Sequence, residues 1–506
     1  MTLLRMTGRG ATLALGLAVA LAPVACRGQT TGSAPVAAAD AGTAPATVAT
    51  GGATMLGGSP SRNMVNLTDN GVPTEWNVGK GTAKNFKWAA ELGTRGYLPP
   101  AVAGGKVYVG TNNKKPRDPA VKGDKAVLMC FDEATGKFLW QLAHDMPPPE
   151  VVTQAKEDGM LSTPAVEGNR LYYMAPAAEL VCASTDGKVV WRLDLMKDFK
   201  VHPCYLSFCG PLVVGDLVFA ITGNGRAGEE PASPVPSPEA PSFVAVDKKT
   251  GKVVWKDNSP GANIMEGQWA SPAHAVVGGK PQVIFPGGDG WLYAFEPATG
   301  KLIWKFDGNP KDAVWKPGGK GTKNYLLNPV VHGDRVYTGV GQNPDNGVDV
   351  SYLWCVDITK TGDVSAELEK GKANPNSGVV WSFGGKSPDG AKRDFLFGRT
   401  ISYCAVHDGL VYVAELDGFV HCLDAATGKP HWEEDLKSAT WSSPLWVDGK
   451  VYVPDDQGYV HIFAHGKEKK LVGKVEMEEP MKAAPVVAGG VLYLVGDKHL
   501  YAIGAK

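Results

Sequence analysis

The sequence predicts an all-β fold, an eight-bladed β-propeller of four-stranded antiparallel blades, on the strength of three observations. Apolar residues alternate along many short segments, and helix-period stretches are scarce. Two short motifs recur along the chain, one of them eight times. The repeated region begins with a spare strand and ends one strand short of a full unit. Together these features favour sheets that stack around an axis and close into a ring.

The first motif reads Pro-Val-Val-x-Gly-x-x-Val-Tyr, which predicts two strands joined by a turn at the glycine. One of its eight copies, the one that starts at Pro272, is stretched. The copies span Pro100–Tyr108, Pro164–Tyr172, Pro211–Phe219, Pro272–Ile284, Pro329–Tyr337, Cys404–Tyr412, Pro444–Tyr452 and Pro485–Tyr493.

The second motif is a strand, a Thr-Gly turn and another strand that ends in Trp, and Ala245–Trp255 shows it best. Glycine takes the positive φ that such a turn needs. Each complete unit therefore holds four short strands, which cannot bury both of their faces alone. Close copies span Cys130–Trp140, Ala294–Trp304 and Cys422–Trp432.

The ends of the repeat predict how the ring closes. After the eighth first motif, Lys498–Ile503 supplies a third strand, and no fourth strand follows. A spare strand, Asn85–Leu92, precedes the first unit, with Trp88 where a closing Trp belongs. We expect this N-terminal strand to complete the last blade, which would leave no exposed edge.

The first residues are typical of an export signal. Arg5 and Arg9 precede an apolar run that is too short to span a bilayer permanently. We predict a signal peptide over 1–26, with Cys26 a candidate lipidation site and ordinary cleavage the alternative. Residues 27–54 are rich in Ala, Thr, Pro and Gly and predict a disordered tether, and 55–506 predict the propeller. The chain is thus expected in the periplasm, or anchored by a lipid to a membrane facing it.

The pattern Ala-x-Asp-x-x-Thr-Gly-x-x-x-Trp resembles the tryptophan-docking motif of the pyrroloquinoline-quinone (PQQ) repeat family, over Phe86 to Lys506. The resemblance implies that each Trp packs against the neighbouring blade. The family includes quinone- and calcium-dependent alcohol and sugar dehydrogenases and BamB-like outer-membrane assembly lipoproteins, so the fold does not choose a function.

Cysteine placement bears on that choice. Many of the calcium-dependent quinoproteins set a disulfide between adjacent cysteines against the quinone, and no two cysteines here are adjacent. Cys130, Cys182, Cys355 and Cys422 share one repeat position, where they act as small core residues. Cys204 and Cys209 are close enough in sequence to be candidates for a disulfide.

Long loops are predicted to gather on one face, because loops between strands two and three share a face with those that cross between blades. Long loops on a rigid scaffold favour a working surface there. Aromatic and cationic residues at the inner ends of the crossing loops suit a planar ligand, a sugar face or an anionic group. The candidate ligand residues are Arg95, Tyr97, Gln268, Trp269, Asn324, Tyr325, Arg399, Thr400, Trp441 and Lys482.

We interpret the chain as a monomeric, non-catalytic scaffold that binds an envelope protein or glycan. The alternatives are a PQQ- and calcium-dependent alcohol or sugar dehydrogenase, and a carbohydrate-binding or carbohydrate-active propeller. The 51 Lys and Arg nearly balance the 52 Asp and Glu, which disfavours nucleic acid as a partner. No cofactor, metal site or catalytic residue is assigned.

Overall fold

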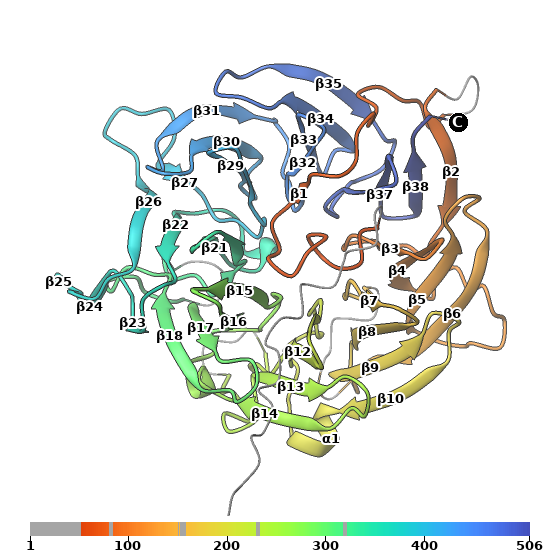
Figure 1. Ribbon diagram of the computed structural model, residues 1–506, viewed down its shortest axis with the longest axis horizontal. Helices are drawn as coiled ribbons and strands as arrows, with labels where there is room; N and C mark the ends of the chain where they lie inside the picture. Colours follow the sequence, from red (N-terminus) through yellow and green to blue (C-terminus); the bar gives the residue numbers. More distant parts are fainter. Residues whose placement is uncertain are drawn as a thin grey trace, which may run out of the picture. The chain divides into compact units, whose positions relative to one another are not determined.

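The computed structural model describes residues 52–79, 84–149, 151, 158–228, 233–316 and 321–505. Residues 1–51, with the predicted signal peptide, Cys26 and nearly all of the predicted tether, lie outside this part. Eight sheets stand around an axis, with the first strand of each blade innermost (Figure 1). The predicted eight-bladed propeller is therefore confirmed. In the described part, no helix has the length and apolar character needed to cross a membrane.

Blades 1 to 4 follow one another along the chain, each with neighbouring strands antiparallel. Blade 1 holds β3 (Ala101–Ala103), β4 (Lys106–Asn112), β5 (Lys125–Asp132) and β6 (Phe138–Asp145). Blade 2 holds β7 (Ala165–Glu167), β8 (Arg170–Ala175), β9 (Glu179–Ser184) and β10 (Val189–Asp194). Blade 3 holds β11 (Leu212–Val214), β12 (Leu217–Ile221), β13 (Phe243–Asp247) and β14 (Val253–Asp257), and blade 4 holds β15 (Ala273–Val277), β16 (Lys280–Pro286), β17 (Trp291–Phe295) and β18 (Leu302–Asp307).

Blades 5 to 8 repeat this plan. Blade 5 holds β20 (Val330–His332), β21 (Arg335–Gly341), β22 (Tyr352–Asp357) and β26 (Val379–Lys386); blade 6 holds β28 (Ala405–His407), β29 (Leu410–Ala414), β30 (Phe419–Asp424) and β31 (Pro430–Asp435); blade 7 holds β32 (Leu445–Val447), β33 (Lys450–Pro454), β34 (Tyr459–Ala464) and β35 (Leu471–Glu476); blade 8 holds β36 (Val486–Ala488), β37 (Val491–Val495), β38 (His499–Ile503) and β2 (Phe86–Glu91).

Short elements decorate this ring. β19 (Leu326–Leu327) and β27 (Phe395–Phe397) extend blade 5, and β23 (Gly362–Asp363) adds to the outer edge of blade 4. β24 (Glu367–Glu369) and β25 (Lys372–Ala373) form a hairpin. The helix α1 (Leu195–Phe199) begins at Asp194, whose carboxylate accepts from Lys197 N. Two 3₁₀ turns span Gly261–Asn263 and Pro344–Asn346.

The ring closes as predicted. β2 pairs antiparallel with β38, and Trp88 lies opposite Ala502. The Trp88 indole donates to Glu133 O of blade 1 at 3.0 Å. Its ring also fills the space beside Gly136, whose φ is +69° and where a Cβ would lie 2.5 Å from the ring. Any other residue at Gly136 would thus meet both backbone strain and a clash.

The other motif tryptophans dock in the same way, each with its indole N–H on a carbonyl of the next blade. Such bonds join Trp140 to Thr185, Trp191 to Lys248, Trp255 to Pro297, Trp381 to Ala425 and Trp432 to Gly466. Trp304 differs, because its N–H bonds Gln282 within its own blade.

Blade 7 lacks a closing Trp, and an N-terminal segment takes its place. Trp76 is buried between blades 7 and 8 and donates to Met477 Sδ at 3.0 Å. Gly473 of β35 lies against Thr74 O, where a Cβ would come within 2.5 Å. The sequence does not announce this substitution, because Trp76 stands outside the repeat.

Residues 53–69 form a segment that we call the strap. It contains β1 (Val65–Asn66), which pairs parallel with β32, and runs through the middle of the ring before the chain reaches β2 at the rim (Figure 1). The strap bonds the innermost strand of every blade, or the residues just before it. Backbone bonds join Ala53 to Val102, Thr54 to Val166, Pro60 to His274, Ser61 to Val331 and Met64 to Trp446, while side chains join Arg62 to Gly210, Asn63 to Val406 and Asn66 to Val487.

Arg62 is the most buried part of the strap. Its guanidinium has no exposed surface and donates to four carbonyls, those of Leu56, Gly210, Pro211 and Pro272, at 2.8–3.2 Å. Burial lowers its pKa. A buried cation is costly unless every donor is satisfied, and here the donors bond carbonyls from three parts of the ring.

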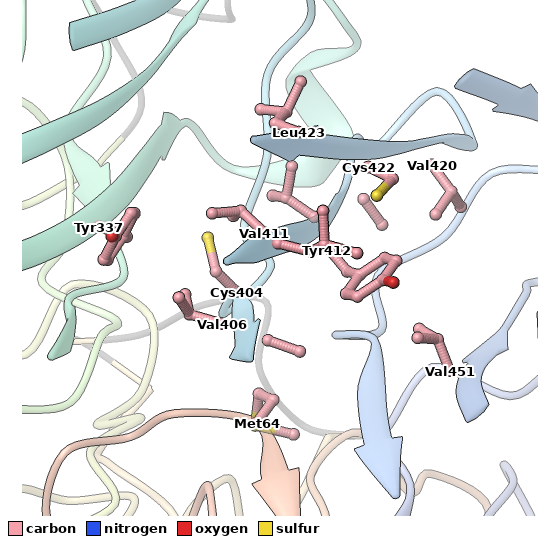
Figure 2. Packing of buried hydrophobic residues seen from close by; sticks show 14 of the residues in the cluster. Met64, Tyr337, Cys404, Val406, Val411, Tyr412, Val420, Cys422, Leu423 and Val451 are labelled. Atoms are coloured by element: carbon pink, nitrogen blue, oxygen red, sulfur yellow. The ribbon is translucent and has the colours of Figure 1, made fainter. Parts of the chain in front are cut away.

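The apolar core lies between adjacent blades. Figure 2 shows it at blade 6, where Cys404 lies beside Val406 and Val411, Tyr412 lies toward Val451 of blade 7, and Met64 of the strap belongs to the same cluster. The four cysteines at the shared repeat position are fully buried, as the sequence indicates. They act as small core residues.

Candidate functional site

A cavity of about 760 Å³ lies on the propeller axis. Each of the eight crossings between blades contributes to its wall, together with the long loops at Arg226–Gly228 and Asn343–Asp345. These loops join strands two and three of blades 3 and 5, so the cavity opens on the face predicted to carry the long loops. Leu56 of the strap also lines the cavity.

Four cavity residues form a cluster that we call the cation–ring quartet: Arg95, Tyr97, Trp441 and Lys482. The rings of Tyr97 and Trp441 stack with centroids 5.8 Å apart. Lys482 Nζ lies 4.7 Å from the Trp441 ring centre and 5.0 Å from that of Tyr97. Arg95 lies 5.8 Å from the Tyr97 ring centre. Such cation–π contacts fix two positive charges against two rings.

The quartet depends on ring closure. Arg95 and Tyr97 directly follow β2, the N-terminal strand of blade 8, whereas Trp441 and Lys482 precede blades 7 and 8. The pairing of β2 with β38 helps to bring these distant parts of the sequence together.

No ion pair joins Lys482 or Arg95 to a carboxylate within the described part of the chain. The electrostatic neighbours of Lys482 are Asp456 and Asp497. Burial raises the pKa of Asp456 to about 6, and it raises that of Asp497 as well. The backbone N–H of Trp441 acts in the opposite direction and lowers the pKa of Asp456.

An aromatic wall of Tyr205, Phe208 and Trp269 faces another part of the cavity. Phe208 and Trp269 have centroids 5.5 Å apart, and the Trp269 indole donates to Cys204 O at 3.1 Å. A Cβ on Gly267 would lie 2.4 Å from the Trp269 ring, so the ring is held against bare backbone. Tyr205 has a φ of +66°, which is uncommon for a bulky residue and often marks functional sites.

The two buried carboxylates of the cavity already have donors. Asp158 accepts from the hydroxyl of Tyr205. Glu266 accepts from the hydroxyl of Tyr325 and, at 3.2 Å, from Asn343. Burial, followed by the charge of Glu266, raises the pKa of Tyr325, so its hydroxyl stays protonated as a donor. Each buried acid is thus compensated within the protein.

The ten candidate residues were chosen from loop position alone, and five of them line the cavity. These are Arg95, Tyr97, Trp269, Trp441 and Lys482. Whether they bind a ligand stays a prediction.

The other five candidates are buried behind the wall. Gln268 donates to Asn224 O, Asn324 O accepts from Asn309, and Tyr325 bonds Glu266. The Arg399 guanidinium has no exposed surface and bonds Gly321 O, with Asp349 3.8 Å away. Thr400 donates to Ala414 O as Thr440 does to Pro454 O one blade later, so this position repeats as a structural one.

Sequence reasoning missed Asp158, Tyr205, Phe208, Arg226 and Glu266. Each lies in a loop that crosses between blades or in a long loop of the same face. Considering the crossing loop of every blade could therefore have found most of them. Arg226 lies over the Trp315 ring at 4.7 Å.

The candidate disulfide is absent from the structure. Cys209 is a fully buried free thiol that accepts from Ile221 N at 3.3 Å, and burial raises its pKa to about 12. Cys204 lines the cavity instead.

The cavity can be tested for PQQ and calcium, which the family implies. Tryptophan rings and the three cations Arg95, Arg226 and Lys482 suit a planar polyanion. In the described residues, however, no three His, Cys, Asp or Glu side chains are grouped as a metal site. We therefore derive no step that needs calcium.

Comparison with known proteins places the fold. A family model described as outer membrane protein assembly factor BamB matches residues 123–371 and 372–465, more than half of the chain. The chain belongs to this family of PQQ-repeat propellers. The crystal structure of BamB from Moraxella catarrhalis has a TM-score of 0.53 and covers 83% of this chain and 97% of its own, at 15% identity, which shows the fold alone.

Curated relatives of this PQQ-repeat propeller fall into two groups. Polyvinylalcohol dehydrogenase of Sphingopyxis sp. (strain 113P3) is 28% identical over 258 residues, 46% of this chain and 38% of the relative. BamB of Pseudomonas aeruginosa is 29% identical over 100 residues, 19% of this chain and 26% of the relative. The chain spans less than half the length of the curated relatives it matches. Family membership therefore leaves catalysis and assembly both open.

Proposed function

We propose that the chain is a non-catalytic binding propeller of the cell envelope, which holds its partner at the face with the long loops. The central cavity carries the proposal. All eight crossings converge on it, and its wall combines rigid aromatic rings with cations. Concave sites with a few placed polar groups are where ligands usually bind. The envelope location is supported by the relatives described as outer membrane assembly factors.

A capture experiment tests this proposal. The full chain is cross-linked in an envelope extract and compared with the double variant Trp441→Ala, Lys482→Met. The matched control is Tyr459→Ala, Lys474→Met, because that lysine lies 4.3 Å from the Tyr459 ring centre outside the cavity wall. We expect the same partner with the full chain and the control, and its loss with the double variant. If the control loses the partner and the double variant keeps it, the proposed face is wrong.

A quinone-dependent dehydrogenase is the second candidate, favoured by the 258-residue match to polyvinylalcohol dehydrogenase. The test is to add PQQ and calcium to the purified chain while following quinone absorbance and dye reduction. Saturable quinone uptake with alcohol-dependent turnover would replace the scaffold proposal. We expect no turnover.

A further inference from the structure

The charges of the cavity are asymmetric. Its two buried acids, Asp158 and Glu266, already accept hydrogen bonds from tyrosine hydroxyls. The third, Asp345, is exposed. Lys482 and Arg95, by contrast, contact rings and form no ion pair within the described residues, although Asp456 lies near Lys482 and Asp497 near both cations. An incoming anion could therefore gain charge-assisted bonds here, whereas a cation would find acids that are already satisfied.

The rest of the wall suits a hydroxyl-rich ring. Tyr205, Phe208 and Trp269 offer aromatic surface. Polar side chains also line the cavity, each with at least one hydrogen bond inside the protein: Asn328, Asn343, Ser271 and Ser443. Sugars bind in this way, with an apolar ring face on an aromatic side chain and hydroxyls on polar groups.

A peptide fits the same space less well. Extended peptides gain most of their affinity by pairing with an open strand edge. Along the axis the strap already bonds the innermost strand of each blade or the residues just before it.

We infer that the cavity binds an acidic glycan, with a sugar carboxylate beside Lys482 and Arg95 and a sugar ring against the wall of Tyr205, Phe208 and Trp269. This inference rests on the proposed function, since it assigns a ligand class to the same cavity. It names the partner's chemistry as a carboxylated sugar chain.

Titration calorimetry of the full chain with trigalacturonate tests the inference. The methyl ester of the same trisaccharide removes the charge and keeps the ring, and hexaglutamate supplies charge without sugar. We expect saturable binding of trigalacturonate, binding of the ester weaker by about tenfold or more, and none of the peptide. High salt should weaken the acid form and leave the ester unchanged.

Variants locate the charge contact. Lys482→Met and Arg95→Met should each weaken trigalacturonate by about tenfold. Lys474→Met, which removes a cation–π lysine outside the cavity, should leave it unchanged. Melting curves establish that each variant is folded.

The pH dependence of trigalacturonate binding is a second test, because it would not change if Lys482 had only a structural role. Lys482, Asp455 and Asp497 are the charged neighbours of Asp456, whose pKa burial raises to about 6. As the pH falls through about 6, Asp456 loses its charge beside Lys482 while the galacturonate carboxyls stay ionised. Trigalacturonate binding should therefore strengthen over this range.

The outcomes separate the two proposals. Equal binding of acid and ester, or binding of hexaglutamate alone, overturns the acidic-glycan inference. If no probe binds and the quartet variant still loses its partner in the capture experiment, this inference fails and the proposed function stands. If trigalacturonate binds and the capture is insensitive to the quartet, the proposed function fails and the glycan site stands.

Discussion

The strap and the cation–ring quartet occupy the same propeller axis and treat charge in opposite ways. Arg62 of the strap gives its guanidinium hydrogens to four carbonyls and has no exposed surface. Lys482 of the quartet is half-buried and lies against two rings. A cation whose donors are used up holds a fold together, whereas one that faces rings beside a cavity is available to a ligand. Under the proposed function, the strap stabilises the fold and the quartet recognises the ligand.

Removing the strap and β2 together should give the largest effect. A chain that begins at Gly93 loses the whole strap, Trp76 and Trp88, and leaves β38 as an open edge. Loss of one buried Trp alone costs about 3–5 kcal/mol, a large share of typical stability. We expect no cooperative unfolding transition by calorimetry. A chain that begins at Gly51 is the matched control, and equal melting of the two would mean that neither segment secures the ring.

The next effect should come from Arg62→Met. It keeps most of the side-chain length and leaves four buried carbonyls without their donor. We expect a loss of about 3 kcal/mol or more in urea unfolding, since unsatisfied buried groups are costly. Arg95→Met in the cavity wall should change stability by less than about 0.5 kcal/mol, because Arg95 is only partly buried and forms no ion pair within the described residues. Similar losses for both variants would remove the contrast between the strap and the quartet.

The smallest effect is a pH dependence in blade 4. Asp289 is buried in the turn after β16 and accepts from Tyr293 Oη at 2.6 Å. Burial raises its pKa from 3.8 to about 6. The protonated form is therefore favoured on folding, and the contribution present below about pH 4 is lost as the pH rises through 6. Wild-type stability should fall over this range, on the order of 2 kcal/mol relative to Asp289→Asn. Parallel pH profiles for the two proteins would contradict this.

The repeat made the blades and the closure predictable, because each strand shows its own alternation of apolar and polar residues and each turn has its own glycine. The docking of Trp88 on Gly136 follows from motif spacing alone. The strap could not be predicted in this way. It bonds the blades mostly through backbone groups, which every sequence possesses, and its one visible signal is Arg62 in a stretch without other basic residues.

The site was half predictable, for a related reason. Loop order gives the face on which a residue lies and says nothing about the direction of its side chain. Gln268 and Trp269 are neighbours, yet the first bonds loop backbone behind the wall and only the second lines the cavity. Arg399 is drawn inward by Gly321 O and Asp349, a partnership that no local pattern encodes.

The strap also bears on the order in which the protein folds. Asn66 is synthesised early, and its partner Val487 lies 421 residues later in the chain. Contacts this distant in sequence require a large loop to close first, and they slow folding. The strap can bond all of its partners only when the eighth blade exists, so a ring with a missing or misplaced blade would leave Arg62 or its neighbours unsatisfied. Arg62→Met should therefore raise the unfolding rate more than it slows refolding, because its bonds form at the last step.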